Sequence, residues 1–154
     1  IEVSQEQVYF ASLGLGEEFW PDLREGHWWR DRMGGGRGAV KPALLRQDRV
    51  VGVGNIAASE MLWMAGVHPE ATLNVLSMAE WNAIAKGASR HVANTLKRED
   101  GDSLSYVNEG GSNLFHVYGK AGEGCERCGV SIERIVQSGR ATFFCPSCQP
   151  SPSG

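Results

Sequence analysis

Two short stretches, CERC at residues 125–128 and CPSC at residues 145–148, decide the fold of the last third of this chain. Each is a C-x2-C turn that can place two thiolates on one metal ion, and sixteen residues separate the two turns. This spacing is typical of a structural zinc site with four cysteine ligands. The sequence therefore predicts one zinc ion, with no ligand position left for a catalytic water, held by Cys125, Cys128, Cys145 and Cys148.

Two other uses of the four cysteines stay open at this point. Two disulfides would need an oxidising compartment, which no other feature of the sequence indicates. A redox-active C-x2-C pair normally opens a helix in a βαβ unit, and neither pair lies in such a pattern. The histidines are scattered and are not needed as ligands: they are His27, His68, His91 and His116.

The residues between the two cysteine turns predict a β-hairpin. The runs Ile132–Val136 and Ala141–Phe144 read as strands, joined by a turn over residues 137–140. A hairpin of this size buries too little surface to fold alone, so we expect metal binding to supply the folding free energy.

Helices are predicted upstream of the zinc site. One runs from Asn55 to about Ala65, because apolar residues recur there at spacings of three and four and a glycine follows. A longer one follows the capping box Ser77–Glu80 and ends near Lys97-Arg98. A short helix is expected to start at Pro42. The apolar face of the longer helix consists of Trp81, Ile84, Ala85, Ala88, Val92 and Leu96.

Composition narrows the class of protein. The chain of 154 residues is 42% hydrophobic and 21% charged, as in globular proteins, and it has no apolar run of the roughly 20 residues that span a bilayer. The first residues do not resemble a secretory signal, so we expect an intracellular location: cytoplasm or nucleoid, or the nucleus or an organelle in a eukaryote. The net charge is −3, but residues 1–40 hold seven acids against four bases, and the rest is nearly balanced.

Two residues are candidates for binding an anion. Asn55 follows a glycine-rich turn where a helix begins, so its side chain and the free amides there suit a phosphate, although an ordinary helix cap has the same pattern. Arg140 lies in the hairpin turn, where an arginine is commonly only solvated.

The order and spacing of these motifs resemble the formamidopyrimidine-DNA glycosylase / endonuclease VIII (Fpg/Nei) family of base-excision repair enzymes. Its helix–two-turns–helix is matched by VKPALL (40–45), VVGVGNI (50–56), SE (59–60) and AGVHP (65–69). Its carboxy-terminal zinc finger is matched by VYGK (117–120), CERC (125–128) and RATFFCPSC (140–148). The resemblance covers residues 40–149.

The resemblance implies a mainly α fold with a small β-hairpin zinc finger. A helix–two-turns–helix domain at residues 40–118 would bind DNA and precede a four-cysteine zinc ribbon, the zinc finger, at residues 119–149. We expect residues 1–39 to be a linker or the remnant of an amino-terminal domain, and residues 150–154 to be a disordered tail. Positions that contact backbone phosphates in the family correspond to Lys41, Asn55, Tyr118 and Arg140.

The resemblance does not extend to the family's catalytic groups. Those enzymes open with Pro-Glu, whose proline amine attacks the damaged nucleotide, and carry a catalytic lysine in an amino-terminal β-sandwich. This sequence opens with Ile1-Glu2. We therefore assign no catalytic residue and predict that the chain as given is inactive alone. The segment between Asp100 and Tyr118 is also shorter than the family's lesion-capping loop.

Two functions follow. The first is the damaged-DNA binding module of an Fpg/Nei-type DNA glycosylase, without its catalytic domain in this chain. The second is a shortened, non-catalytic relative that binds RNA or DNA as a structural component of a ribonucleoprotein assembly. That role would suit a protein partner on residues 1–39, where Trp20, Trp28 and Trp29 are expected to be exposed. A zinc-ribbon scaffold that binds no nucleic acid fits the two motifs least well.

Overall fold

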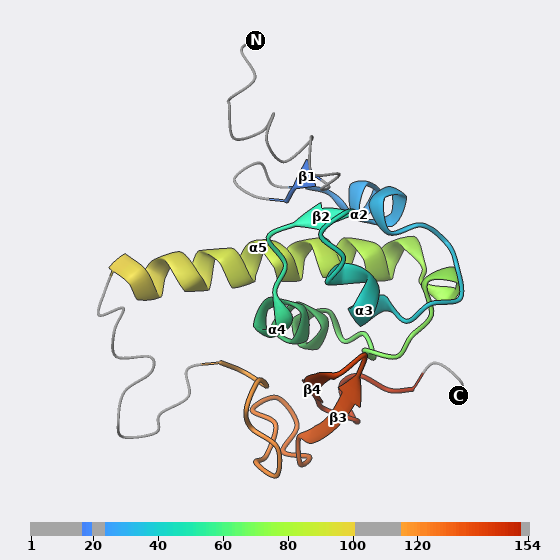
Figure 1. Ribbon diagram of the computed structural model, residues 1–154. Helices are drawn as coiled ribbons and strands as arrows, with labels where there is room; N and C mark the ends of the chain where they lie inside the picture. Colours follow the sequence, from blue (N-terminus) through green and yellow to red (C-terminus); the bar gives the residue numbers. More distant parts are fainter. Residues whose placement is uncertain (1–16, 20–23, 101–114, 152–154) are drawn as a thin grey trace.

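Figure 1 shows a computed structural model of the chain, which describes residues 17–19, 24–100 and 115–151. The helices are α2 (Gly26–Met33), α3 (Val40–Leu44), α4 (Asn55–Ala65) and α5 (Met78–Asp100), with a 3-10 turn at Leu73–Val75. The strands are β1 (Glu17–Glu18), β2 (Val50–Val51), β3 (Glu133–Gln137) and β4 (Arg140–Phe144). Within the described residues the fold is mainly α with a small β-hairpin, as the sequence predicted.

The long helix α5 organises the amino-terminal part of the fold. Helices α2 and α4 both pack against it (Figure 1), around a core that includes Trp29, Met61 and Trp81. Helices α4 and α5 come so close at Gly87 of α5 that a Cβ atom there would lie 2.7 Å from the carbonyl oxygen of Met61 in α4. Glycine therefore allows the close crossing of α4 and α5.

The capping box predicted for α5 is present. The Glu80 amide donates to Ser77 Oγ at 3.1 Å, and the Ser77 amide donates to Glu80 Oε1 at 2.9 Å. These two bonds satisfy amides that a helix start leaves free. Leu96, expected on the buried face, is instead 40% exposed, because α5 extends beyond the helices that pack on it (Figure 1).

The start of α3 differs from the prediction. The helix begins at Val40, so Pro42 is its third residue and Lys41 is already helical. Proline is tolerated there because the first amides of a helix have no intrahelical acceptor. The Lys41 amide donates to the Pro69 carbonyl oxygen instead, at 3.3 Å.

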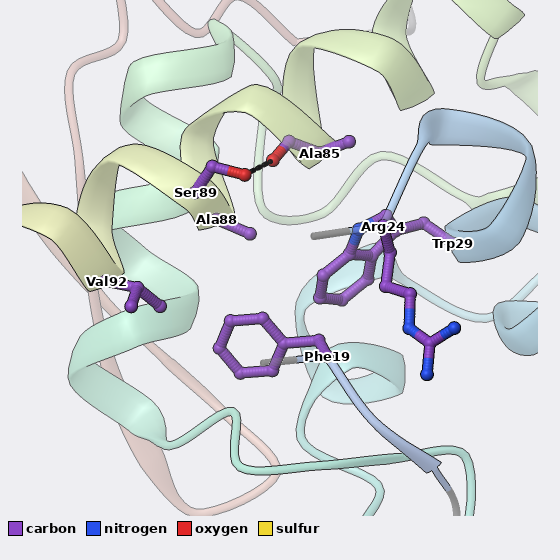
Figure 2. Close-up of a pocket in the computed structure, with 7 residues that line it drawn as sticks. All are labelled: Phe19, Arg24, Trp29, Ala85, Ala88, Ser89 and Val92. Atoms are coloured by element: carbon purple, nitrogen blue, oxygen red, sulfur yellow. Dashed lines mark hydrogen bonds between the residues drawn. The ribbon is translucent and has the colours of Figure 1, made fainter. Parts of the chain in front are cut away.

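The segment before α3 is better packed than its sequence indicated. Trp29, expected to be exposed, is fully buried, and Trp28 is half-buried, while Trp20 lies outside the described residues. Figure 2 shows why: Trp29 and Phe19 face Ala85, Ala88 and Val92 of α5 across a space too narrow for a water molecule. This contact belongs to the hydrophobic core and is not a ligand site. No helix of the described residues is long and apolar enough to span a bilayer.

Helix α4 is buried on all sides. Its residues 57–63 are all buried, with α5 against one side and strand β4 against another. The helical period identified Ala58, Met61 and Leu62 but did not identify Glu60 and Trp63, which contact the zinc finger.

Glu60 connects α4 to the start of the zinc finger. Its carboxylate is 1% exposed and accepts hydrogen bonds from three successive amides, those of His116 (2.8 Å), Val117 (2.8 Å) and Tyr118 (3.1 Å). Hydrogen bonds of this kind to a charged acceptor are the strong ones in proteins, and here they offset the cost of burying the carboxylate.

Two buried glutamines make a second connection. Gln149 accepts from the Cys145 amide at 2.9 Å and donates to the Val67 carbonyl oxygen at 2.9 Å. Gln137 donates to the Pro69 carbonyl oxygen at 3.0 Å. The zinc finger is thereby hydrogen-bonded both to α4 and to the loop that follows it.

Replacing Glu60 with glutamine tests this connection. The amide group places two donors where the carboxylate had only acceptors, so at least one amide of residues 116–118 loses its partner. We expect Glu60→Gln to lower the free energy of unfolding by about 2–3 kcal/mol in urea denaturation. The exposed Glu70→Gln is the control and should change stability little. Equal stability of the two variants would contradict this account.

Candidate zinc centre and phosphate-binding site

The four predicted cysteines lie together. Their Sγ atoms all lie within 4.8 Å of one another, with Cys125 to Cys148 at 3.9 Å and Cys128 to Cys145 at 3.4 Å. Four thiolates at about 2.3 Å from a tetrahedral zinc ion require sulfur separations close to these. A disulfide needs about 2.05 Å, and all four cysteines are free. The residues fit one structural zinc ion.

Amide and indole groups surround these sulfurs. The Arg127 amide and the Trp63 indole N–H each donate to Cys125 Sγ at 3.4 Å, and the Cys148 amide donates to Cys145 Sγ at 3.4 Å. Burial raises the pKa of Cys125, but the hydrogen bonds from Arg127 and Trp63 outweigh it and lower this pKa to about 6. Burial raises the pKa of the Cys145 thiol to about 12 in the absence of metal, and a bound zinc ion favours its thiolate form.

The hairpin between the cysteine turns is antiparallel, with Gln137 paired to Arg140. Ser138 and Gly139 form its two-residue turn, both with positive φ (50° and 78°), as hairpin turns of this length require. The strands differ from the predicted ones by one residue at three boundaries. The two boundaries at the turn differ because the turn is shorter than the four residues assigned to it, and the first strand begins at Glu133 instead of Ile132. Arg140 is consequently the first residue of β4, next to the tip.

Lys41, Asn55 and the start of β4 meet at one place. Lys41 is fully buried, and its Nζ donates to Asn55 Oδ1 at 2.5 Å. Asn55 Nδ2 in turn donates to the Ala141 carbonyl oxygen at 2.9 Å. The side-chain amide of Asn55 thus joins Lys41 of α3 to Ala141, the residue that follows Arg140. We call Lys41, Asn55 and Arg140 the basic cluster.

The electrostatics of the basic cluster favour an anion. Burial, and then the nearby Arg140 guanidinium, lower the pKa of Lys41 from 10.5 to about 8. Two cations held close together repel each other unless an anion lies between them. Asn55 is also the first residue of α4, where free amides and the helix dipole favour negative charge.

Tyr118, the fourth predicted contact, lies in a turn that packs against strand β4. Its ring packs edge-on against Phe143 of β4, with ring centres 5.0 Å apart, and its amide is held by Glu60. The structure therefore brings Lys41, Asn55 and Arg140 together and places Tyr118 beside the same strand.

Three residues that matter to this site were given no role from the sequence: Glu60, which the resemblance included only as part of SE (59–60), Trp63 and Gln149. The available signal was weak. Glu60 is a lone carboxylate inside the apolar run AASEMLW (57–63), which indicates a buried, paired charge.

Comparison with known proteins gives consistent matches over this architecture. Residues 23–106 match the family model described as the formamidopyrimidine-DNA glycosylase H2TH domain. Residues 122–150 match the model described as a zinc finger found in FPG and IleRS. These two matches cover the helical part and the zinc finger.

Individual proteins that resemble this chain belong to the same family as the two family models. The chain is 41% identical to the formamidopyrimidine-DNA glycosylase of Shouchella clausii, over 74% of this chain and 43% of that protein. It is 38% identical to that of Burkholderia multivorans, over 90% of this chain and 52% of that protein. A solved complex of Lactococcus lactis Fpg with DNA containing an abasic site matches with a TM-score of 0.78 and 33% identity, over 97% of this chain and 57% of that one. The chain spans about half the length of the curated relatives it matches.

The zinc centre makes a direct prediction. Protein purified without chelator should contain one zinc ion per chain by elemental analysis. Cys128→Ser should lose the metal and open the segment from about Gly119 onward to limited proteolysis, because the hairpin is too small to fold without it. Ser131→Ala, an exposed change in the same finger, should retain both zinc and resistance. Absence of metal in the wild type would refute the assignment.

Proposed function

Because the chain belongs to the formamidopyrimidine-DNA glycosylase (Fpg/Nei) family, we propose that it binds damaged DNA through the sugar-phosphate backbone. The observation that carries this proposal is the basic cluster. Three polar side chains from α3, α4 and β4 converge where a helix begins. One of them is a buried lysine, and among the described residues its ammonium group donates to the Asn55 side chain and to no carboxylate.

The cluster suits a phosphate for a physical reason. A charged lysine removed from water has already lost its hydration, so the desolvation cost of contacting an anion is partly met before binding. Arg140 adds two parallel N–H donors suited to phosphate oxygens. Such contacts fix the position of the backbone and carry no information on base sequence.

The rigid connections described above serve this role. Lys41 and Asn55 belong to the helical part, and Arg140 belongs to the zinc finger. The helical part and the finger must therefore keep a fixed distance if all three residues are to contact one stretch of the DNA backbone. Glu60, Gln137 and Gln149 supply that constraint. The relatives whose structures match include complexes with DNA containing abasic or oxidised sites, which favours a kinked or damaged duplex as ligand.

The alternative is a structural component of a ribonucleoprotein assembly that uses the same cluster on RNA. Part of its support came from tryptophans expected to be exposed, and Trp29 is buried in the core. Parallel titrations with an abasic DNA duplex and an RNA duplex of the same length distinguish the two roles: tighter binding of RNA would favour the alternative.

Replacing Arg140 with alanine is the first test of backbone binding. Arg140→Ala should weaken binding to an abasic duplex by about 1–3 kcal/mol, because a charge-assisted contact is lost. It should also reduce the slope of log affinity against log salt by about one phosphate. Asn55→Ala should cost less and leave the slope unchanged, since it removes no charge.

The control is Lys86→Ala, which removes one exposed positive charge from α5, and α5 packs on α4 away from the hairpin (Figure 1). It should retain the wild-type affinity and salt slope. If Arg140→Ala and Lys86→Ala behave alike in a fluorescence-anisotropy salt titration, the basic cluster does not bind the backbone.

Lys41 predicts a pH dependence of binding. A phosphate binds the protonated lysine, and the pKa of Lys41 in the free protein is about 8. Affinity should therefore be nearly constant below about pH 7, be about halved at pH 8, and fall about tenfold between pH 7 and pH 9 for the loss of one proton. Lys41→Met should bind more weakly at pH 7 and lack this decline. An equal decline in wild type and variant would rule out Lys41 as the titrating group.

A further inference from the structure

Trp63 of α4 contacts a zinc ligand directly. The side chain is 5% exposed, and its indole Nε1–H donates to Cys125 Sγ at 3.4 Å. Trp63 and Cys125 are 62 residues apart in the sequence and belong to different parts of the fold. The helix that begins with Asn55 therefore contributes a hydrogen-bond donor to the metal centre.

Two side chains from the carboxy-terminal segment hold the indole in place. The Arg127 guanidinium lies 3.8 Å from the Trp63 ring centre, and the His116 ring stacks on it at 4.8 Å with an interplanar angle of 13°. Both groups therefore lie in contact with the indole ring.

Further hydrogen bonds fix the Arg127 and His116 side chains. Arg127 Nη2 donates to the Trp63 carbonyl oxygen at 2.6 Å, and His116 Nδ1 lies 2.6 Å from Glu126 Oε1. Arg127 and Glu126 both lie inside the first cysteine turn. The two side chains that contact the ring are thus held by the first cysteine turn, and the ring N–H meets the sulfur of that turn.

We propose that Trp63 is an outer-sphere residue of the zinc centre, whose indole N–H stabilises the Cys125 thiolate and so strengthens zinc binding. A thiolate is a better hydrogen-bond acceptor than a thiol, so the indole N–H favours the form of Cys125 that zinc binds. Groups that hydrogen-bond to metal ligands commonly change metal affinity by about 10- to 100-fold when they are removed. Through this bond, zinc occupancy stabilises α4 as well as the finger.

Trp63→Phe separates the hydrogen bond from the packing. Phenylalanine keeps an aromatic ring in contact with Arg127 and His116 but has no N–H. We expect its zinc affinity, measured by competition with a chromophoric chelator, to fall about tenfold. The matched control is Trp81→Phe, which removes the same group from a buried tryptophan of α5 in the helical core, away from the cysteines.

A spectroscopic measurement distinguishes the bond from mere destabilisation. In the cobalt(II)-substituted protein, the sulfur-to-cobalt charge-transfer band should shift in Trp63→Phe and stay unchanged in Trp81→Phe, because only the former alters electron density on a ligand sulfur. A shift together with weaker zinc binding in Trp63→Phe alone supports the proposal. Wild-type zinc affinity in Trp63→Phe, or an equal loss in both variants with no band shift, overturns it.

The wild-type chain supplies a test that does not depend on comparing zinc affinities. In the cadmium-113 protein, one indole proton should show scalar coupling to the metal across the N–H···S bond, and replacing Trp63 should remove that signal. The absence of any coupled indole proton in the wild type would overturn the proposal.

Discussion

The arrangement depends most on one buried carboxylate. Glu60 lies in the middle of α4 with almost no exposure and accepts three consecutive backbone amides at the point where the chain enters the zinc finger. A buried charge is tolerated only when its hydrogen-bonding capacity is met, and here residues 116–118 meet it. Any other position of the finger on α4 would leave the carboxylate unpaired. The charge therefore specifies how the two parts of the fold are joined.

The other contacts at this interface act in the same direction. Gln149 joins the second cysteine turn to the loop after α4 by hydrogen bonds. Asn55, the first residue of α4, donates a hydrogen bond from its side chain to β4. Metal, hairpin and helix consequently form one structural unit, in which zinc stabilises more than the residues that ligate it. This explains how a lysine on α3 and an arginine on the hairpin, 99 positions apart in the sequence, keep a fixed relation.

Much of this could be predicted because the signals are local in sequence. The cysteine turns, the capping box of α5 and the glycine after α4 each act within about four residues, and each was found. The misses share the opposite property. Glu60, Trp63 and Gln149 have partners 56 to 82 residues away, and no periodic pattern reports such contacts. Helix α2 was missed because it has only eight residues and polar side chains interrupt its apolar pattern. It is stabilised by packing on α5, which the local sequence does not indicate.

The central claim is that α3, α4 and the finger present one phosphate-binding site, and a crystal structure of this chain with an abasic duplex tests it most directly. We expect one backbone phosphate within hydrogen-bond distance of both the Lys41 ammonium and the Arg140 guanidinium, with α4 and the finger related as they are in Figure 1. A duplex bound elsewhere, with Lys41 still buried and bonded only to Asn55, would contradict it.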